Sequence, residues 1–273
     1  AAVTTGYLYV LETTAGARIY DPIEIPYGNN HPTVTISSLG VVAVTSGSGV
    51  RQYDLATGAL ITEFDLGSYV YTLNDICYSP DGKQFATVET DGTTVNNYGN
   101  IRFFDATTGV QTMLIEKVCV DGLRSIGCSP DGAFVAAAPA SSIDVSVHLY
   151  NATSGALVRQ LTDLTGLNGD MRCTAFSADS QNVISGGASR ELRQYDVATG
   201  TLVTETLSTG GAWIQGCSYS HSSNTIAFTE DTEHAVRLID ASTGRTTGTI
   251  ADPTSSTQYQ VKFKPSAPFV SLG

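Results

Sequence analysis

The segment VRQYDLATGAL occupies residues 50–60, and its pattern returns four times further along the chain. The later copies are IRFFDATTGVQ at 101–111, VHLYNATSGAL at 147–157, LRQYDVATGTL at 192–202 and VRLIDASTGRT at 236–246. The anchor residues of the five copies, which are separated by 51, 46, 45 and 44 positions, are Asp54, Asp105, Asn151, Asp196 and Asp240. A near-constant period of this length indicates a repeat architecture in which each unit packs on its neighbours.

Each unit carries a second phrase upstream of the first. The copies are CYSPDGKQFATV at 77–88, GCSPDGAFVAAA at 127–138, AFSADSQNVISG at 175–186 and SYSHSSNTIAFT at 218–229. In Ser-Pro-Asp-Gly, Pro presets the backbone for a turn, Asp bonds nearby amides and Gly takes the left-handed conformation. The Asp-x-x-Thr-Gly phrase predicts a second turn, capped by Asp or Asn and completed by a glycine with positive φ.

The segments that flank these turns are short and rich in β-branched and aromatic residues, which favours strands. Each unit therefore predicts four antiparallel strands, which we name a to d. The Ser-Pro-Asp-Gly turn joins strands a and b, and the Asp-x-x-Thr-Gly turn joins strands c and d.

Four-stranded units at this period are typical of a β-propeller, and at this point the chain resembles the WD40-repeat family. The dipeptides that stand where that family has Trp-Asp are Tyr53-Asp54, Phe104-Asp105, Tyr150-Asn151, Tyr195-Asp196 and Ile239-Asp240. The repeats are degenerate, because the chain has no Gly-His dipeptide and no Trp in these positions. The family's buried Ser-His-Asp-Trp network is therefore absent or replaced. Lactonase-like propellers carry similar repeats and remain an alternative.

The number of blades follows from the strands at the two ends. Residues 1–273 are expected to form a single all-β propeller domain, with five complete units between about residues 33 and 250. The N-terminal segments YLYVLET, ARIYD and IEIPY supply strands b, c and d, and the C-terminal QYQVKFKP supplies strand a. We therefore predict six blades, closed by strands from both termini. A seventh blade is the alternative, because it would absorb FVSLG at 269–273.

Composition limits the classes of partner. The chain has 14 basic and 26 acidic residues, a formal charge of −12, which argues against nucleic-acid binding because phosphate contacts need clustered Lys and Arg. No apolar run is long enough for membrane insertion, so a soluble protein is expected. The charge itself is explained by the solubility that a β-rich protein needs.

The cysteine pattern predicts buried free thiols. The count of five is odd, no Cys-x-x-Cys occurs, and four of the five fall on the expected strand a, namely Cys77, Cys128, Cys173 and Cys217. Unpaired cysteines favour an intracellular location. The four histidines are scattered, so no metal site is predicted.

The candidate binding residues lie where strand a enters the rim. The d–a and b–c loops vary most between units, and in propellers of this family they open on one face around the central channel. The residues expected at this rim are Asn74, Arg124, Arg172, Gln215, Tyr259, Trp213, Tyr71 and Tyr98. Tyr, Trp and Arg are enriched in binding hot spots, and two arginines on adjacent blades suit an acidic peptide or a carboxylate.

Two alternatives compete with that interpretation. Both arginines would be structural if they paired with Asp75, Asp121 or Asp170, and Trp213 would be structural if it were a buried wedge between blades. Catalysis finds no support, because neither a Gly-x-Ser-x-Gly elbow nor a phosphate-binding loop occurs.

The function expected from the sequence is therefore a non-enzymatic WD40-like scaffold that binds a protein or peptide, with no cofactor and no catalytic or metal residue. The alternatives are a lactonase- or hydrolase-like propeller with a site in the channel, and a structural subunit of a larger assembly.

Overall fold

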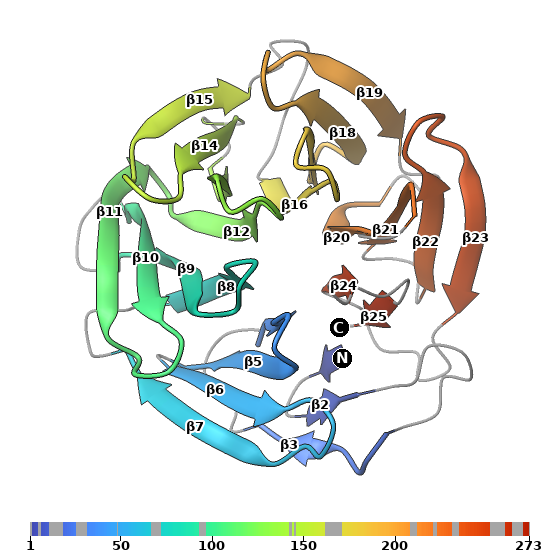
Figure 1. The fold of residues 1–273 in the computed structure, drawn as a ribbon. Helices are drawn as coiled ribbons and strands as arrows, with labels where there is room; N and C mark the ends of the chain where they lie inside the picture. Colours follow the sequence, from blue (N-terminus) through green and yellow to red (C-terminus); the bar gives the residue numbers. More distant parts are fainter. Residues whose placement is uncertain are drawn as a thin grey trace.

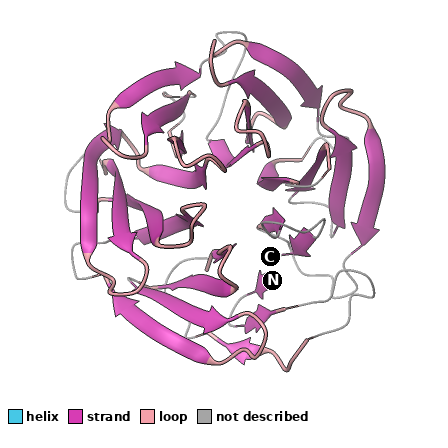
Figure 2. Ribbon diagram, viewed as in Figure 1, coloured by secondary structure: helices cyan, strands magenta, loops and turns pink. Residues whose placement is uncertain are grey.

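The computed structural model describes residues 2–4, 7–10, 19–25, 32–47, 49–66, 72–92, 97–141, 144, 146–161, 171–207, 212–220, 223–230, 235–251, 260–263 and 270–272. Within these ranges every regular element is a β-strand (Figure 2). The same ranges hold no helix that is long and apolar enough to cross a membrane.

Five four-stranded antiparallel sheets surround a central axis as the blades of a propeller (Figure 1). In each sheet the first strand lies nearest the axis, and chain order runs outward. The strands of the first two blades are β4 (Val34–Ile36), β5 (Val41–Ser46), β6 (Gly49–Asp54), β7 (Leu60–Asp65), β8 (Thr72–Tyr78), β9 (Gln84–Thr90), β10 (Gly99–Asp105) and β11 (Gln111–Cys119). The strands of the other three are β12 (Leu123–Cys128), β13 (Phe134–Pro139), β14 (Val147–Asn151), β15 (Leu157–Leu161), β16 (Met171–Phe176), β17 (Asn182–Gly187), β18 (Glu191–Asp196), β19 (Leu202–Leu207), β20 (Ile214–Tyr219), β21 (Thr225–Glu230), β22 (Ala235–Asp240) and β23 (Thr246–Ala251).

The prediction of six or seven blades is wrong: the described residues form five complete blades. Strands from both ends of the chain lie between the first and last blades (Figure 1), but they do not join into one four-stranded sheet. They form a three-stranded sheet of β1 (Ala2–Thr4), β2 (Tyr7–Tyr9) and β3 (Ile23–Glu24), and a two-stranded sheet of β24 (Val261–Phe263) and β25 (Val270–Leu272).

The reason is a local competitor for the edge of β24. The sequence assigned that edge to the N-terminal strand β2, but β24 pairs with β25, which is close to it in the sequence. Pairing two segments that are close in the sequence costs less entropy than recruiting a strand from the far end of the chain. Likewise, β2 pairs directly with β3, and Ile19 to Asp21, expected in strand c, form no strand.

The c–d turns form as predicted. The Oδ1 atom of Asp54 accepts hydrogen bonds from the backbone N of Thr57 at 2.8 Å and from its hydroxyl at 2.7 Å. Asn151 accepts the equivalent bonds from the Ser154 N at 2.8 Å and hydroxyl at 3.0 Å, so it replaces Asp without loss of the turn. The predicted glycines have positive φ in every copy, namely Gly58, Gly109, Gly155, Gly200 and Gly244.

An ion pair or histidine contact that was not predicted from the sequence recurs in strand c of every blade. A basic residue stands three positions before each turn Asp or Asn, and the pairs are Arg51–Glu63, Arg102–Glu89, His148–Asp144, Arg193–Glu191 and Arg237–Glu230. Glu89 and Glu230 are each 1% exposed and lie 2.8 and 2.7 Å from their arginines. Buried carboxylates require such partners. The signal was present as the second letter of VRQYD, IRFFD, VHLYN, LRQYD and VRLID.

Candidate binding site at the mouth of the channel

Four consecutive inner strands carry a β-bulge at the residue predicted for the rim. In β8, Leu73 pairs with Glu89 and Asp75 with Val88, so Asn74 is the extra residue between them. The same irregularity in β12, β16 and β20 makes extra residues of Arg124, Arg172 and Gln215. A bulge redirects a side chain and ends regular pairing. In these four blades the repeat thus places one non-repeating side chain each at the same level of the ring.

These four residues line one cavity of about 140 Å³ at the end of the channel where the inner strands β8, β12, β16 and β20 begin. We name this cavity the mouth. Its other lining residues include Pro32, Cys173, Cys217, Gln260 and Lys262. A second cavity, of about 270 Å³, opens at the opposite end between the a–b turns, and Lys262 reaches both. The axis is therefore hollow from both ends.

Arg172 and Trp213 form the most distinctive contact near the mouth. The guanidinium carbon of Arg172 lies 4.4 Å from the centroid of the indole, and its Nη1 donates to Gln215 Oε1 at 2.9 Å. Trp213 is 40% exposed, so it is not a buried wedge between blades. Such cation–π stacking orients the guanidinium and leaves its charge near the opening.

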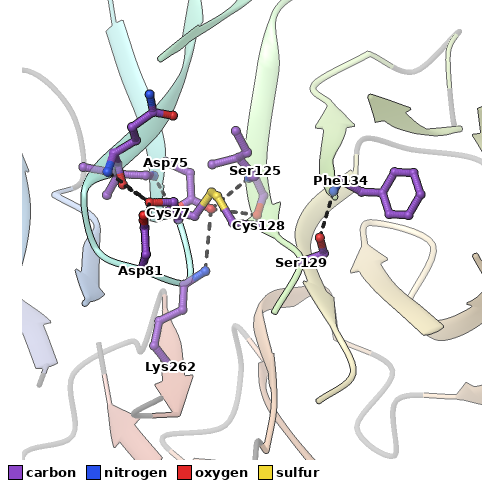
Figure 3. Close-up of a disulfide and its surroundings, with 12 residues drawn as sticks. Asp75, Cys77, Asp81, Ser125, Cys128, Ser129, Phe134 and Lys262 are labelled. Carbon is purple, nitrogen blue, oxygen red and sulfur yellow. Dashed lines mark hydrogen bonds and ion pairs between the residues drawn. A yellow bond between two sulfur atoms is a disulfide. The ribbon is translucent and has the colours of Figure 1, made fainter. Parts of the chain in front are cut away.

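Asp75 was expected to form an ion pair with Arg124 or Arg172, but the contacts described for its carboxylate are with other residues. It is 1% exposed and lies below the mouth. Its Oδ2 accepts from the Ser125 hydroxyl at 2.8 Å and from the Ile126 N at 3.1 Å, and its Oδ1 accepts from Gln260 Nε2 at 2.7 Å. Lys262 Nζ is 3.8 Å from Oδ2 (Figure 3). Asp75 therefore ties the second blade to the third blade and to the C-terminal strand.

A disulfide links the inner strands beside Asp75. Cys77 of β8 and Cys128 of β12 are joined, with their Cα atoms 5.8 Å apart (Figure 3). The prediction of free thiols is wrong for this pair, and the argument from it for an intracellular location is lost. The physical reason is that neighbouring inner strands converge at the axis, so cysteines 51 positions apart come within bonding range. Cys119, Cys173 and Cys217 are free and buried.

The remaining predicted residues are not all at the mouth. Tyr71 and Tyr259 lie outside the described residues. Tyr98 is half-buried beside Lys117, whose Nζ is 5.8 Å from its ring centroid, and it does not line the mouth. Gln260 and Lys262 do line it and were missed, because counting back from the turn pointed to Tyr259.

Arg124, Arg172 and Lys262 line the mouth with basic side chains, and Lys262 is paired there with the buried carboxylate of Asp75. In the described part of the chain, no group of three or more His, Cys, Asp or Glu side chains is placed to hold a metal ion. No protein-family profile and no curated protein matches this sequence. The assignment of a propeller of four-stranded antiparallel blades therefore rests on the strand pairing in the structure.

Proposed function

We propose that the protein is a non-enzymatic, WD40-like scaffold that binds an acidic segment of a protein or peptide partner at the mouth of its channel. The observation that carries the proposal is the set of four bulges, which brings Asn74, Arg124, Arg172 and Gln215 from four adjacent blades to one cavity. A rigid scaffold that presents non-repeating side chains at one opening suits recognition.

Charge favours an acidic ligand. The molecule has a formal charge of −12, yet Arg124, Arg172 and Lys262 all line the mouth. A guanidinium binds a carboxylate through charge-assisted hydrogen bonds, which are about twice as strong as neutral ones. Trp213 adds an exposed aromatic face beside Arg172, and Trp and Arg are the residue types most enriched in hot spots.

Size favours a side chain of a peptide over a free metabolite. Small-molecule pockets usually measure roughly 300–1,000 Å³. The mouth, at about 140 Å³, is smaller and admits one or two side chains. The rest of such a partner would lie across the rim.

The test uses charge reversal with a control on the opposite face. Arg124→Glu with Arg172→Glu reverses two charges at the mouth, and Lys83→Glu with Arg245→Glu reverses two exposed charges at the a–b and c–d turns. Immobilised peptide panels of acidic, neutral and basic sequences are probed with each protein. Wild type and control should capture the same acidic peptides, and the mouth variant should bind them at least about tenfold more weakly.

Thermal unfolding checks that the mouth variant is folded. Equal capture of acidic peptides by all three proteins, or capture of basic peptides alone, would overturn the proposal.

A further inference from the structure

Inner strands of adjacent blades meet with a constant stagger. The residue that directly follows the bulge residue of one blade contacts a residue of the next blade. That second residue stands two positions after the bulge residue of its own blade. Asp75 contacts the Ile126 N in this way at 3.1 Å, and the Ser125 hydroxyl accepts from the Thr174 N at 3.2 Å. The stagger therefore recurs at successive interfaces around the axis.

The disulfide obeys the same stagger two residues further along the strand. Cys77 stands three positions after Asn74, and Cys128 stands four positions after Arg124. Side chains two residues apart on a strand point to the same face. The Asp75–Ile126 pair of positions and the Cys77–Cys128 pair of positions therefore both bring residues of neighbouring blades together.

Cys173 and Cys217, on the adjacent strands β16 and β20, stand at the positions that Asp75 and Ile126 occupy on β8 and β12. Cys173 stands one position after Arg172, and Cys217 stands two positions after Gln215. Burial, together with the neighbouring Cys173 side chain, raises the pKa of Cys217 well above its usual range, which places the two thiols next to each other. The cysteines are 4% and 1% exposed, and both line the mouth, which gives a small reagent its route to them.

We propose that Cys173 and Cys217 form a redox-active dithiol that a peroxide converts into a second disulfide between blades. One thiolate attacks a peroxide oxygen, the O–O bond breaks, and the departing hydroxide takes up a proton to form water, leaving a sulfenic acid. The second thiol then attacks that sulfur, the S–O bond breaks, and the departing hydroxide takes the thiol proton and leaves as a second water as the S–S bond forms. Both thiols are oxidised, and the peroxide is reduced.

Cys119 is the internal control. It lies on β11, away from the mouth, and its Sγ donates to the Gly122 carbonyl at 3.0 Å. Burial raises the pKa of Cys119 to about 12 and raises the pKa of Cys217 as well, so the control differs from the pair in its distance from the mouth rather than in acidity. The redox-active pair is therefore expected to react while Cys119 does not.

The experiment counts thiols by mass spectrometry. The folded protein is exposed to hydrogen peroxide, the peroxide is removed, and the protein is denatured without reductant and alkylated. The structure has three free cysteines, and loss of Cys173 and Cys217 leaves one, so the alkylation count should fall from three to one. Proteolysis should then yield a peptide pair linked through Cys173 and Cys217, and dithiothreitol should reverse the link.

Single variants separate this pair from random oxidation. Cys119→Ser should fall from two alkylated thiols to none, whereas Cys173→Ser and Cys217→Ser should each fail to gain the link. The linked peptides are identified in wild type itself, so the result does not depend on how well a variant folds. A count that stays at three, a linked peptide that contains Cys119, or sulfinic acid at Cys173 or Cys217 without a cross-link would overturn the proposal.

Discussion

At the scale of single residues, the c–d turns contain a built-in comparison between Asp and Asn. Hydrogen bonds from the turn hydroxyls and amides hold the pKa of Asp54, Asp105, Asp196 and Asp240 below the usual value of 3.8. Asn151 accepts the same bonds without a charge. These four carboxylates thus make the stability of their turns depend on pH, whereas the c–d turn of the third blade avoids this dependence.

The lowered pKa determines whether stability rises or falls with pH. A carboxylate with a lower pKa in the folded state stabilises the fold above its unfolded pKa, and this stability is lost as the pH falls through the folded pKa. Asp105→Asn should therefore lessen the loss of stability below about pH 4. Asn151→Asp should increase it. Urea unfolding at neutral and acidic pH measures both, and identical acid profiles for the two variants would contradict this account of the turn.

Gly109 and Gly40 have similar positive φ values but different surroundings, so alanine variants at the two positions distinguish backbone strain from a clash between blades. Gly109 has φ +69°, and a Cβ there would overlap the ring of Phe64 from the preceding blade. Gly40 has φ +77° and no atom within 4 Å of the equivalent Cβ. Both alanine variants strain the backbone, and only Gly109→Ala also disturbs the interface. Chemical denaturation should show Gly109→Ala to be less stable than Gly40→Ala by about 1–3 kcal/mol. Equal losses of stability would mean that the Phe64 ring moves aside at no energetic cost.

At the scale of elements, the ion pairs of strand c differ in burial. Glu89 is 1% exposed and lies beside Arg102, whereas the Glu63 side chain that meets Arg51 is 50% exposed. Glu89→Ala leaves a cation without its buried partner and should cost about 3–5 kcal/mol. Glu63→Ala should cost less than about 1 kcal/mol. Equilibrium unfolding of the two variants checks the ranking, and a reversed order would be inconsistent with the pairing.

The disulfide between β8 and β12 is expected to stabilise the ring. Removing it with Cys77→Ala and Cys128→Ala should lower the free energy of unfolding by about 2–4 kcal/mol, because the unfolded chain regains the freedom of a long loop. Reductant should destabilise wild type and leave the double variant unaffected. If reductant affects neither protein, the two cysteines are not bonded in solution.

The same scale shows why the sequence predicts some features and not others. The turns at Ser79 and Asp54 were predictable, because turn chemistry lies within a few adjacent residues. The positions of Asn74, Arg124, Arg172 and Gln215 at the rim followed from counting along a repeat. The bulges, the Cys77–Cys128 bond and the partner of β24 were not predictable, since they depend on how separate sheets meet.

At the scale of the whole molecule, the C-terminal strand is fixed by contacts that cross the ring. Gln260 accepts from the Val34 N of the first blade at 3.0 Å and donates to Asp75 of the second. The Ser218 hydroxyl of the last blade accepts from the Phe263 N at 2.9 Å. One short segment thus contacts three blades, and among the described residues the ring closes without a sixth four-stranded sheet.

The mouth also belongs to this scale, because no single blade contains it. Its lining includes residues of four blades, Pro32 just before the first blade, and Gln260 and Lys262 near the C-terminus, and its basic side chains contrast with the negative charge of the molecule. The central claim is that this opening binds acidic segments. Trp213 reports on it directly, since it is the only tryptophan and stacks on Arg172.

The most direct test is a titration of Trp213 fluorescence with a glutamate-rich peptide and with the same peptide carrying Gln in place of Glu. Arg124→Glu is the matched variant, because it changes the mouth without replacing the cation that stacks on the indole. The acidic peptide should produce a saturable change in wild type, weakened at least about tenfold in Arg124→Glu, and the Gln peptide should produce none. No change with the acidic peptide, or equal affinity in the variant, would contradict the account.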